Sequence, residues 1–146
     1  MQTVALMRAA VREARTLPGI IHAAQSIVGL VAPHDFNSEA RTLYEFVRSR
    51  VRYVRDVHDV ETLTAPLHVL DRMCGDCDDK SMLLASLYEA VGFPTRFVMA
   101  GYHGNLFEHV YLQVLVDDCW VTADPTVPES FGWEAPGATV YWVEKV

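Results

Sequence analysis

The sequence is short of cysteine and has no internal repeat or low-complexity tract, and both absences narrow the class of protein. Three cysteines in 146 residues are too few, and odd in number, for the disulfide framework of a small secreted domain. A composition of 51% apolar and 21% charged residues is typical of a globular chain. A chain of this length buries a sizeable core without disulfide or metal staples, so we expect one globular domain.

Long hydrophobic segments are also missing. The longest apolar stretch, residues 20–32, is interrupted by His22 and Gln25, and it is shorter than the roughly 20 residues that span a bilayer. No cleavable signal pattern opens the sequence. These features predict a soluble, cytoplasmic protein without a membrane partner.

Positive charge is scarce in the second half of the chain. Residues 1–70 hold eight basic and seven acidic residues (+1), whereas residues 71–146 hold four basic and twelve acidic residues (−8). Nucleic acids bind basic surfaces, so an acidic C-terminal half argues against a nucleic-acid partner.

The apolar pattern predicts helices first and strands afterwards. Helices are expected at residues 2–16, 20–31, 37–51, 66–70 and 77–91. Strands are expected at residues 96–100, 108–116, 119–124 and 139–143. Residues 51–57 fit either a helix end or a short strand, and residues 56–65 read as a loop. This order predicts an α+β fold, in which N-terminal helices and a cysteine-bearing helix pack on an antiparallel β-meander.

We divide this single domain, residues 1–146, into three parts. They are a helical N-terminal extension (1–36), a catalytic core (37–126) and a C-terminal loop and strand (127–146). The apolar stripes of the first helices suit packing on the domain or on a partner, so the sequence leaves the oligomeric state open.

The stretch from Cys74 to Asp79 carries the main chemical signal. Asp76 is a good N-cap for the following helix, and Asp79 stands three residues later, as in a capping box. Cys77 is therefore expected on the first helical turn, where free N–H groups and the helix dipole favour a thiolate. The neighbouring aspartates oppose ionisation, so a histidine has to contribute much of the activation.

The register of the predicted hairpin supplies partners for Cys77. A two-residue turn at Asp117–Asp118, or a four-residue loop with the same register, places His109 and Asp124 diagonally on one face of the sheet. Because Asp-Asp is not a favoured two-residue turn, we expect the four-residue loop. A three-residue loop would turn Asp124 to the opposite face. The predicted catalytic residues are Cys77 as nucleophile, His109 as general base and acid, and Asp124 as the orienting carboxylate.

These residues resemble the transglutaminase-like superfamily. The resemblance is carried by Gly75–Asp79 at a helix start, Gly92–Arg96, His109 on a strand and Asp124–Thr126, and it runs from about Tyr44 to Thr126. It implies a papain-like cysteine-proteinase fold, most similar to the compact bacterial and phage-encoded members regarded as cysteine proteases. It also implies acyl transfer through a thioester on a peptide or carboxamide substrate, with no cofactor. The calcium-binding modules and flanking β-domains of the animal enzymes are not present in the sequence.

Other interpretations compete with the triad. A Cys74–Cys77 dithiol would make a thiol oxidoreductase, and Cys74, Cys77, Cys119 and one histidine would make a zinc site. A non-catalytic structural or assembly module, possibly phage-encoded, could retain the scaffold. His103, in a glycine-flanked loop, is the reserve candidate for the catalytic histidine, and Cys74 is expected to be a bystander.

Overall fold

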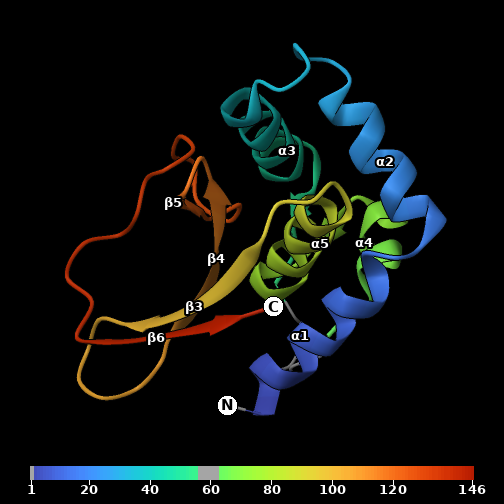
Figure 1. Cartoon of the computed structure of the whole chain (residues 1–146). Helices are drawn as coiled ribbons and strands as arrows, with labels where there is room; N and C mark the ends of the chain where they lie inside the picture. Colours follow the sequence, from blue (N-terminus) through green and yellow to red (C-terminus); the bar gives the residue numbers. More distant parts are fainter. Residues whose placement is uncertain (1, 56–62) are drawn as a thin grey trace.

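The computed structural model describes residues 2–55 and 63–146 (Figure 1). Its helices are α1 (Gln2–Ala14), α2 (Pro18–Val28), α3 (Phe36–Arg50), α4 (Pro66–Arg72) and α5 (Cys77–Ala90). Its strands are β1 (Arg52–Tyr53), β2 (Cys74–Gly75), β3 (Thr95–Gly101), β4 (His109–Val116), β5 (Cys119–Ala123) and β6 (Val140–Lys145). The start of the ambiguous stretch at 51–57 is thus a short strand, and most of the predicted loop at 56–65 lies outside the described residues.

The predicted α+β class is confirmed, with helices gathered on one side of an antiparallel sheet (Figure 1). Strands β3, β4 and β5 form a meander in chain order. The last strand, β6, does not continue it beyond β5 but pairs with β3 at the other edge, giving the order β5-β4-β3-β6. The loop between β5 and β6 therefore crosses the sheet, which local sequence patterns do not specify.

Helix α5 is the centre of the molecule. It contacts α1, α2, α3 and α4 on the helical side and β3 and β4 on the sheet side. All residues from Asp79 to Tyr88 are buried, including Lys80, Ser81 and Ser86. The apolar stripe expected from the sequence therefore underestimates the burial of this helix, because elements pack around its whole circumference.

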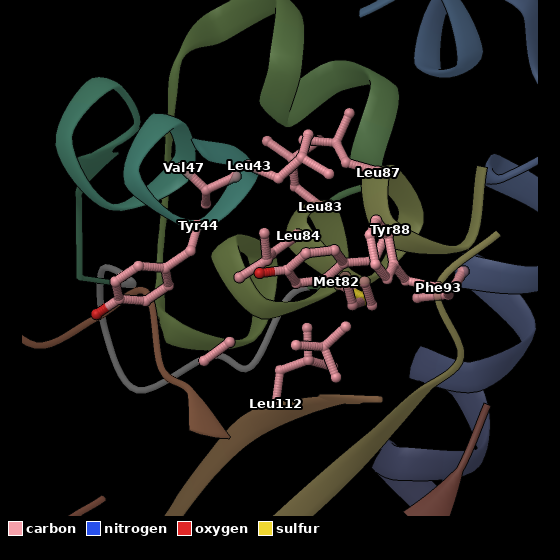
Figure 2. Packing of buried hydrophobic residues seen from close by; sticks show 14 of the residues in the cluster. Leu43, Tyr44, Val47, Met82, Leu83, Leu84, Leu87, Tyr88, Phe93 and Leu112 are labelled. Atoms are coloured by element: carbon pink, nitrogen blue, oxygen red, sulfur yellow. The ribbon is translucent and has the colours of Figure 1, made fainter. Parts of the chain in front are cut away.

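Two buried tyrosines tie the helices together through their hydroxyl groups. Tyr88 of α5 donates a 2.7 Å hydrogen bond to the carbonyl oxygen of Ala40 in α3. Tyr44 of α3 donates to the carbonyl oxygen of Asp124 (3.1 Å) and to that of Glu129 (2.8 Å). Figure 2 shows both side chains within the buried hydrophobic cluster. Tyr44 thereby fixes the chain that leaves β5, next to Asp124.

Helix α3 begins at Phe36, before residues 37–38, where the sequence predicts its start. Asp35 is the N-cap, and its Oδ1 accepts a 3.2 Å hydrogen bond from the backbone N–H of Ser38. The side chain of Ser38 also donates to Asp35, at 2.7 Å. Asn37 and Ser38 therefore lie in the first turn, because the aspartate at position 35 caps the helix before them.

Helix α1 packs on the domain through its apolar face. Val4, Met7, Val11 and Ala14 are buried against the core. At its polar edge, Arg8 pairs with Glu144 of β6, with 2.7 Å between Nη1 and Oε1. Within the described residues, no helix is both long and apolar enough to cross a membrane.

Candidate active site

The capping box at the start of α5 is present as the sequence predicts. Asp76 Oδ1 accepts a 2.9 Å hydrogen bond from the N–H of Asp79, and Asp79 Oδ2 accepts one of 3.2 Å from the N–H of Asp76. The other oxygen of Asp79 accepts from the N–H of Thr64 at 2.9 Å. Cys77 is consequently fixed as the first residue of the helix.

The surroundings of Cys77 favour the protonated thiol. Burial, followed by the negative charges of Asp78 and Asp76, raises the pKa of Cys77 from 9.0 to about 12. The thiol donates to Asp78 Oδ1, with 3.6 Å between the heavy atoms. The first helical turn alone would lower this pKa, so here the acidic neighbours and burial outweigh the helix dipole.

The structure brings His109 and Asp124 together. His109 Nε2 lies 2.7 Å from Asp124 Oδ2. The hairpin joins Val116 to Cys119 in register, which is the residue pairing on which the prediction rested. The expected four-residue loop is wrong: the turn contains two residues, Asp117 and Asp118, both with positive φ (48° and 64°). Such φ values are typical of a type I′ turn, and aspartate tolerates this conformation better than most residues.

Asp124 is an ionised hydrogen-bond acceptor. Its burial acts to raise its pKa, but hydrogen bonds from His109 and Thr126 outweigh this and hold the pKa below its ordinary 3.8. Thr126 donates to Asp124 Oδ1 twice, from its N–H at 3.1 Å and its hydroxyl at 2.6 Å. A carboxylate can only accept, so the hydrogen between Asp124 and His109 belongs to Nε2. The lone pair of the neutral imidazole is then on Nδ1.

Cys77 and His109 line one cavity of about 360 Å³. Asp78 and Glu108 add acidic groups to its wall, and Val4 of α1 contributes an apolar one. The complete set of lining residues is Thr3, Val4, Cys77, Asp78, Met99, Phe107, Glu108, His109 and Val110. The cavity therefore offers a thiol and an imidazole to a molecule that also contacts apolar side chains.

A cavity of similar size, about 390 Å³, lies at the other end of α5 around Gly92 and Phe93. The described residues that line it include neither Cys77 nor His109. Because the candidate nucleophile Cys77 and the candidate base His109 both line the first cavity, we place the candidate active site there.

Sequence reasoning missed several supporting side chains. Tyr111 is not among the predicted site residues, but its ring stacks on His109 with the centroids 5.6 Å apart, and its hydroxyl donates to Glu134 at 2.5 Å. Thr126 belongs to the motif that carries the family resemblance, but the sequence predicts no role for it. An Asp-x-Thr pattern directly after a strand is a signal for the side-chain turn that it forms. Glu134 lies in the loop between β5 and β6, 23 residues after Tyr111, and no local sequence pattern predicts their contact.

The reserve and rival residues lie elsewhere. His103 is exposed and its Nδ1 lies 3.0 Å from Glu108 Oε1, which makes it a partner of that carboxylate. Cys74 is a free, half-buried cysteine in β2, and Cys119 is free and exposed at the start of β5. Across the described ranges, no three His, Cys, Asp or Glu side chains are grouped so that they could hold a metal ion. This finding argues against the zinc site.

Cys77 at the start of α5 therefore shares one cavity with His109 of the antiparallel sheet, and His109 contacts Asp124. The sequence model of the transglutaminase-like superfamily matches residues 21–125. The chain therefore belongs to the transglutaminase-like superfamily.

Solved structures share the fold at low sequence identity. A protein of Cytophaga hutchinsonii, described as a candidate cysteine protease, matches with a TM-score of 0.61 and 19% identity, over 85% of this chain and 45% of its own. LapG of Legionella pneumophila matches with a TM-score of 0.62 and 15% identity, over 96% of this chain and 79% of its own. A chain of the Rad4–Rad23 complex bound to a 6-4 photoproduct UV lesion matches with a TM-score of 0.59 and 12% identity, over 88% and 38%.

The chain thus spans less than half the length of the Cytophaga protein. No curated protein sequence matches the chain.

Proposed function

We propose that the protein is a cysteine hydrolase or acyltransferase that acts on peptide or carboxamide bonds through a thioester. Cys77 is the nucleophile, His109 the general base and acid, and Asp124 the carboxylate that orients His109. The observation that carries the proposal is the 2.7 Å contact between His109 and Asp124, made by a histidine that shares a cavity with Cys77. Membership of the transglutaminase-like superfamily supports the same chemistry.

The first step begins from a neutral pair. Because the pKa of Cys77 is raised to about 12, the resting thiol is protonated at neutral pH. As the substrate enters, the thiol turns from Asp78 toward Nδ1 of His109 and transfers its proton during attack on the carbonyl carbon. The Asp124 carboxylate stabilises the imidazolium that forms, and it holds the ring so that Nδ1 faces the nucleophile.

The remaining steps return the proton. Attack places negative charge on the carbonyl oxygen, and the N–H of Cys77 in the first helical turn is a donor for it. The imidazolium then protonates the leaving amine or ammonia as the C–N bond breaks, which leaves a thioester on Cys77. Water or an acceptor amine, deprotonated by His109, attacks the thioester and releases the thiol. A protein or peptide is the proposed substrate, and the steps use only these side chains.

The decisive experiment measures iodoacetamide alkylation of each cysteine against pH, read by peptide mass spectrometry. In the wild type, alkylation of Cys77 at neutral pH should exceed the rate that a thiol of pKa about 12 allows without a base. Removing the base in His109→Ala should slow it by about 100-fold or more, the usual contribution of general base catalysis. His103→Ala is the matched control and should leave the rate unchanged. Equal rates in the wild type and His109→Ala would refute an activated pair.

The second candidate function is a non-catalytic structural or assembly module. The acidic, buried setting of Cys77 favours it, because that setting opposes thiolate formation. One fold also serves unrelated functions, so the likeness to known structures does not decide between the two. The module predicts that Cys77→Ala retains full biological function, whereas the triad predicts complete loss.

A thiol oxidoreductase makes a different prediction. Its two thiols act together, so Cys74→Ser would be as damaging as Cys77→Ser. The triad predicts a mild effect of Cys74→Ser on reaction with electrophiles. The raised pKa of Cys77 argues against the redox role, since disulfide exchange requires a thiolate.

A further inference from the structure

Another cavity, of about 370 Å³, lies between the end of α3, β1 and the segment that follows Asp124. Four cationic side chains line it: Arg48, Arg50, Arg52 and Lys80. None of the described residues that line it is acidic. In a chain with a net charge of −7, this concentration of positive charge is the opposite of the overall balance.

Lys80 is the deepest of these cations. It is only 3% exposed, and its ammonium donates to the carbonyl oxygen of Arg48 at 3.3 Å. An ammonium has three hydrogens to donate, and a buried cation is costly unless its charge is balanced. Burial and the positive charge of Arg48 lower the pKa of Lys80. The negative charge of Asp124 acts to raise it but does not offset them. An anion in the cavity would supply both the acceptors and the charge.

The arginines present further donors around Lys80. Arg48 is held in place by Glu45, with 2.7 Å between Nη2 and Oε2. Arg50 and Arg52 are exposed, and within the described residues neither forms an ion pair or side-chain hydrogen bond. Guanidinium groups bind the oxygens of phosphate and carboxylate through paired N–H donors.

We propose that this cavity binds a phosphate group, either inorganic phosphate or the phosphate of a small monoester. Four cationic residues line one space, and within the described residues neither Arg50 nor Arg52 is offset by an ion pair. This favours a dianion over a monoanion, because the attraction grows with the charge of the ligand. Pro125, Val127, Pro128 and Tyr53 also line the cavity, and they suit the organic part of a monoester.

The proposed site is separate from the candidate active site but adjoins it. Thr126 lines the basic cavity and also donates twice to Asp124. Phosphate binding requires neither Cys77 nor His109, so it does not depend on the proposed acyl-transfer function. Cys77→Ala should therefore bind phosphate as the wild type does.

The test is isothermal titration of the full chain with inorganic phosphate and with phenyl phosphate, at constant ionic strength set by sodium chloride. We expect one site per chain and an upward shift of the melting temperature that saturates with phosphate. Arg52→Gln and Arg50→Gln change exposed residues and should weaken binding by about tenfold each, the effect of losing one charge-assisted contact. Lys80→Met should weaken it at least as much.

Arg41→Gln, an exposed change on the same helix outside the cavity, is the matched control and should bind as the wild type does. Tighter binding of phenyl phosphate than of inorganic phosphate would show that the ligand of the cavity is a phosphate monoester. Equal binding of the two would show that the ligand is the free phosphate anion. The proposal is overturned if Arg50→Gln and Arg52→Gln bind phosphate like Arg41→Gln. It is also overturned if malonate binds as tightly as phosphate, because the cavity would then not select phosphate.

Discussion

His109 and Asp124 lie in contact, with 2.7 Å between Nε2 and Oδ2, because a two-residue turn folds β5 back on β4. The pair is diagonal across the hairpin, and Asp124 is the first residue after β5. Three groups hold its carboxyl and carbonyl oxygens: the ring of His109, Thr126 and the hydroxyl of Tyr44. Asp124 is therefore a structural as well as a candidate catalytic residue.

Asp124→Asn should change the dependence of stability on pH. The pKa of Asp124 is lowered in the folded state, so its stabilisation is present above its ordinary 3.8 and is lost as pH falls through the folded value. At neutral pH we expect the free energy of unfolding of the variant to be about 1.5–3 kcal/mol lower than that of the wild type, which is the usual contribution of hydrogen bonds to a charged group.

The measurement is urea unfolding of wild type and Asp124→Asn at a series of pH values. The difference in unfolding free energy should shrink as the pH is lowered below 3.8. A difference that stays constant with pH would show that Asp124 has no lowered pKa. Asp71→Asn, an exposed change in α4, serves as the control and should show no such trend.

Asp78→Asn should make Cys77 more reactive. After burial, the negative charge of Asp78 is the largest cause of the raised pKa of the Cys77 thiol. Asp78 also accepts a hydrogen bond from this thiol. Removing its charge lowers this pKa, and the thiolate fraction at pH 7 rises about tenfold if the pKa falls by about one. The alkylation rate should rise with it, while Asp71→Asn leaves it unchanged. A slower rate in Asp78→Asn would mean that Asp78 assists the thiol instead of restraining it.

Features that depend on residues close together in the sequence could be predicted, and features that depend on contacts between distant segments could not. The capping box of Asp76 and Asp79 and the register of His109 and Asp124 depend on neighbours within one helix turn or one hairpin, and both could be read from the sequence. The position of β6 beside β3 and the burial of Lys80 depend on packing between distant segments. Apolar periodicity does not encode such contacts, so a buried charged residue on a central helix was not foreseen.

The candidate site shows the same division. The sequence could name Cys77, but the rise of its pKa through burial and through Asp78 requires the folded surroundings. The stack of Tyr111 on His109 was within reach, since both residues lie on one face of β4. The catalytic roles of Cys77, His109 and Asp124 stay predictions.

Changes at Tyr111 should separate the function of its hydroxyl from that of its ring. Tyr111→Phe removes the hydrogen bond to Glu134 and keeps the stack on His109, so we expect a loss of about 0.5–1.5 kcal/mol and little change in Cys77 alkylation. Tyr111→Leu also removes the ring that stacks on His109. The imidazole is then held less firmly, so replacing His109 by alanine should reduce the alkylation rate of Cys77 by a smaller factor in this variant. Urea unfolding and the alkylation assay measure the two effects. Equal alkylation rates in the two variants would exclude a positioning role for the ring.

Gly75→Ala should disturb the start of α5 through a steric contact. A Cβ at position 75 would lie 2.7 Å from Cβ of Asp79 and 3.2 Å from its Oδ2, so Asp79 has to move. Asp79 is only 4% exposed and holds two backbone N–H groups, so we expect a loss of about 1–3 kcal/mol, typical of overpacking. Cys74→Ala, at the neighbouring half-buried position, should cost less.

A double-mutant cycle with Asp79→Gly tests whether this contact is the cause, because glycine removes the Cβ of Asp79 that lies 2.7 Å from the added methyl group. Asp79→Gly alone should lower the free energy of unfolding by about 1–3 kcal/mol, through the lost capping box and the conformational freedom of glycine in a helix. If the added methyl group acts by displacing Asp79, the double variant should lose clearly less stability than the two single losses combined, because the obstructed side chain is gone. Additive losses would place the effect of Gly75→Ala in the backbone of β2, independent of the capping box that positions Cys77.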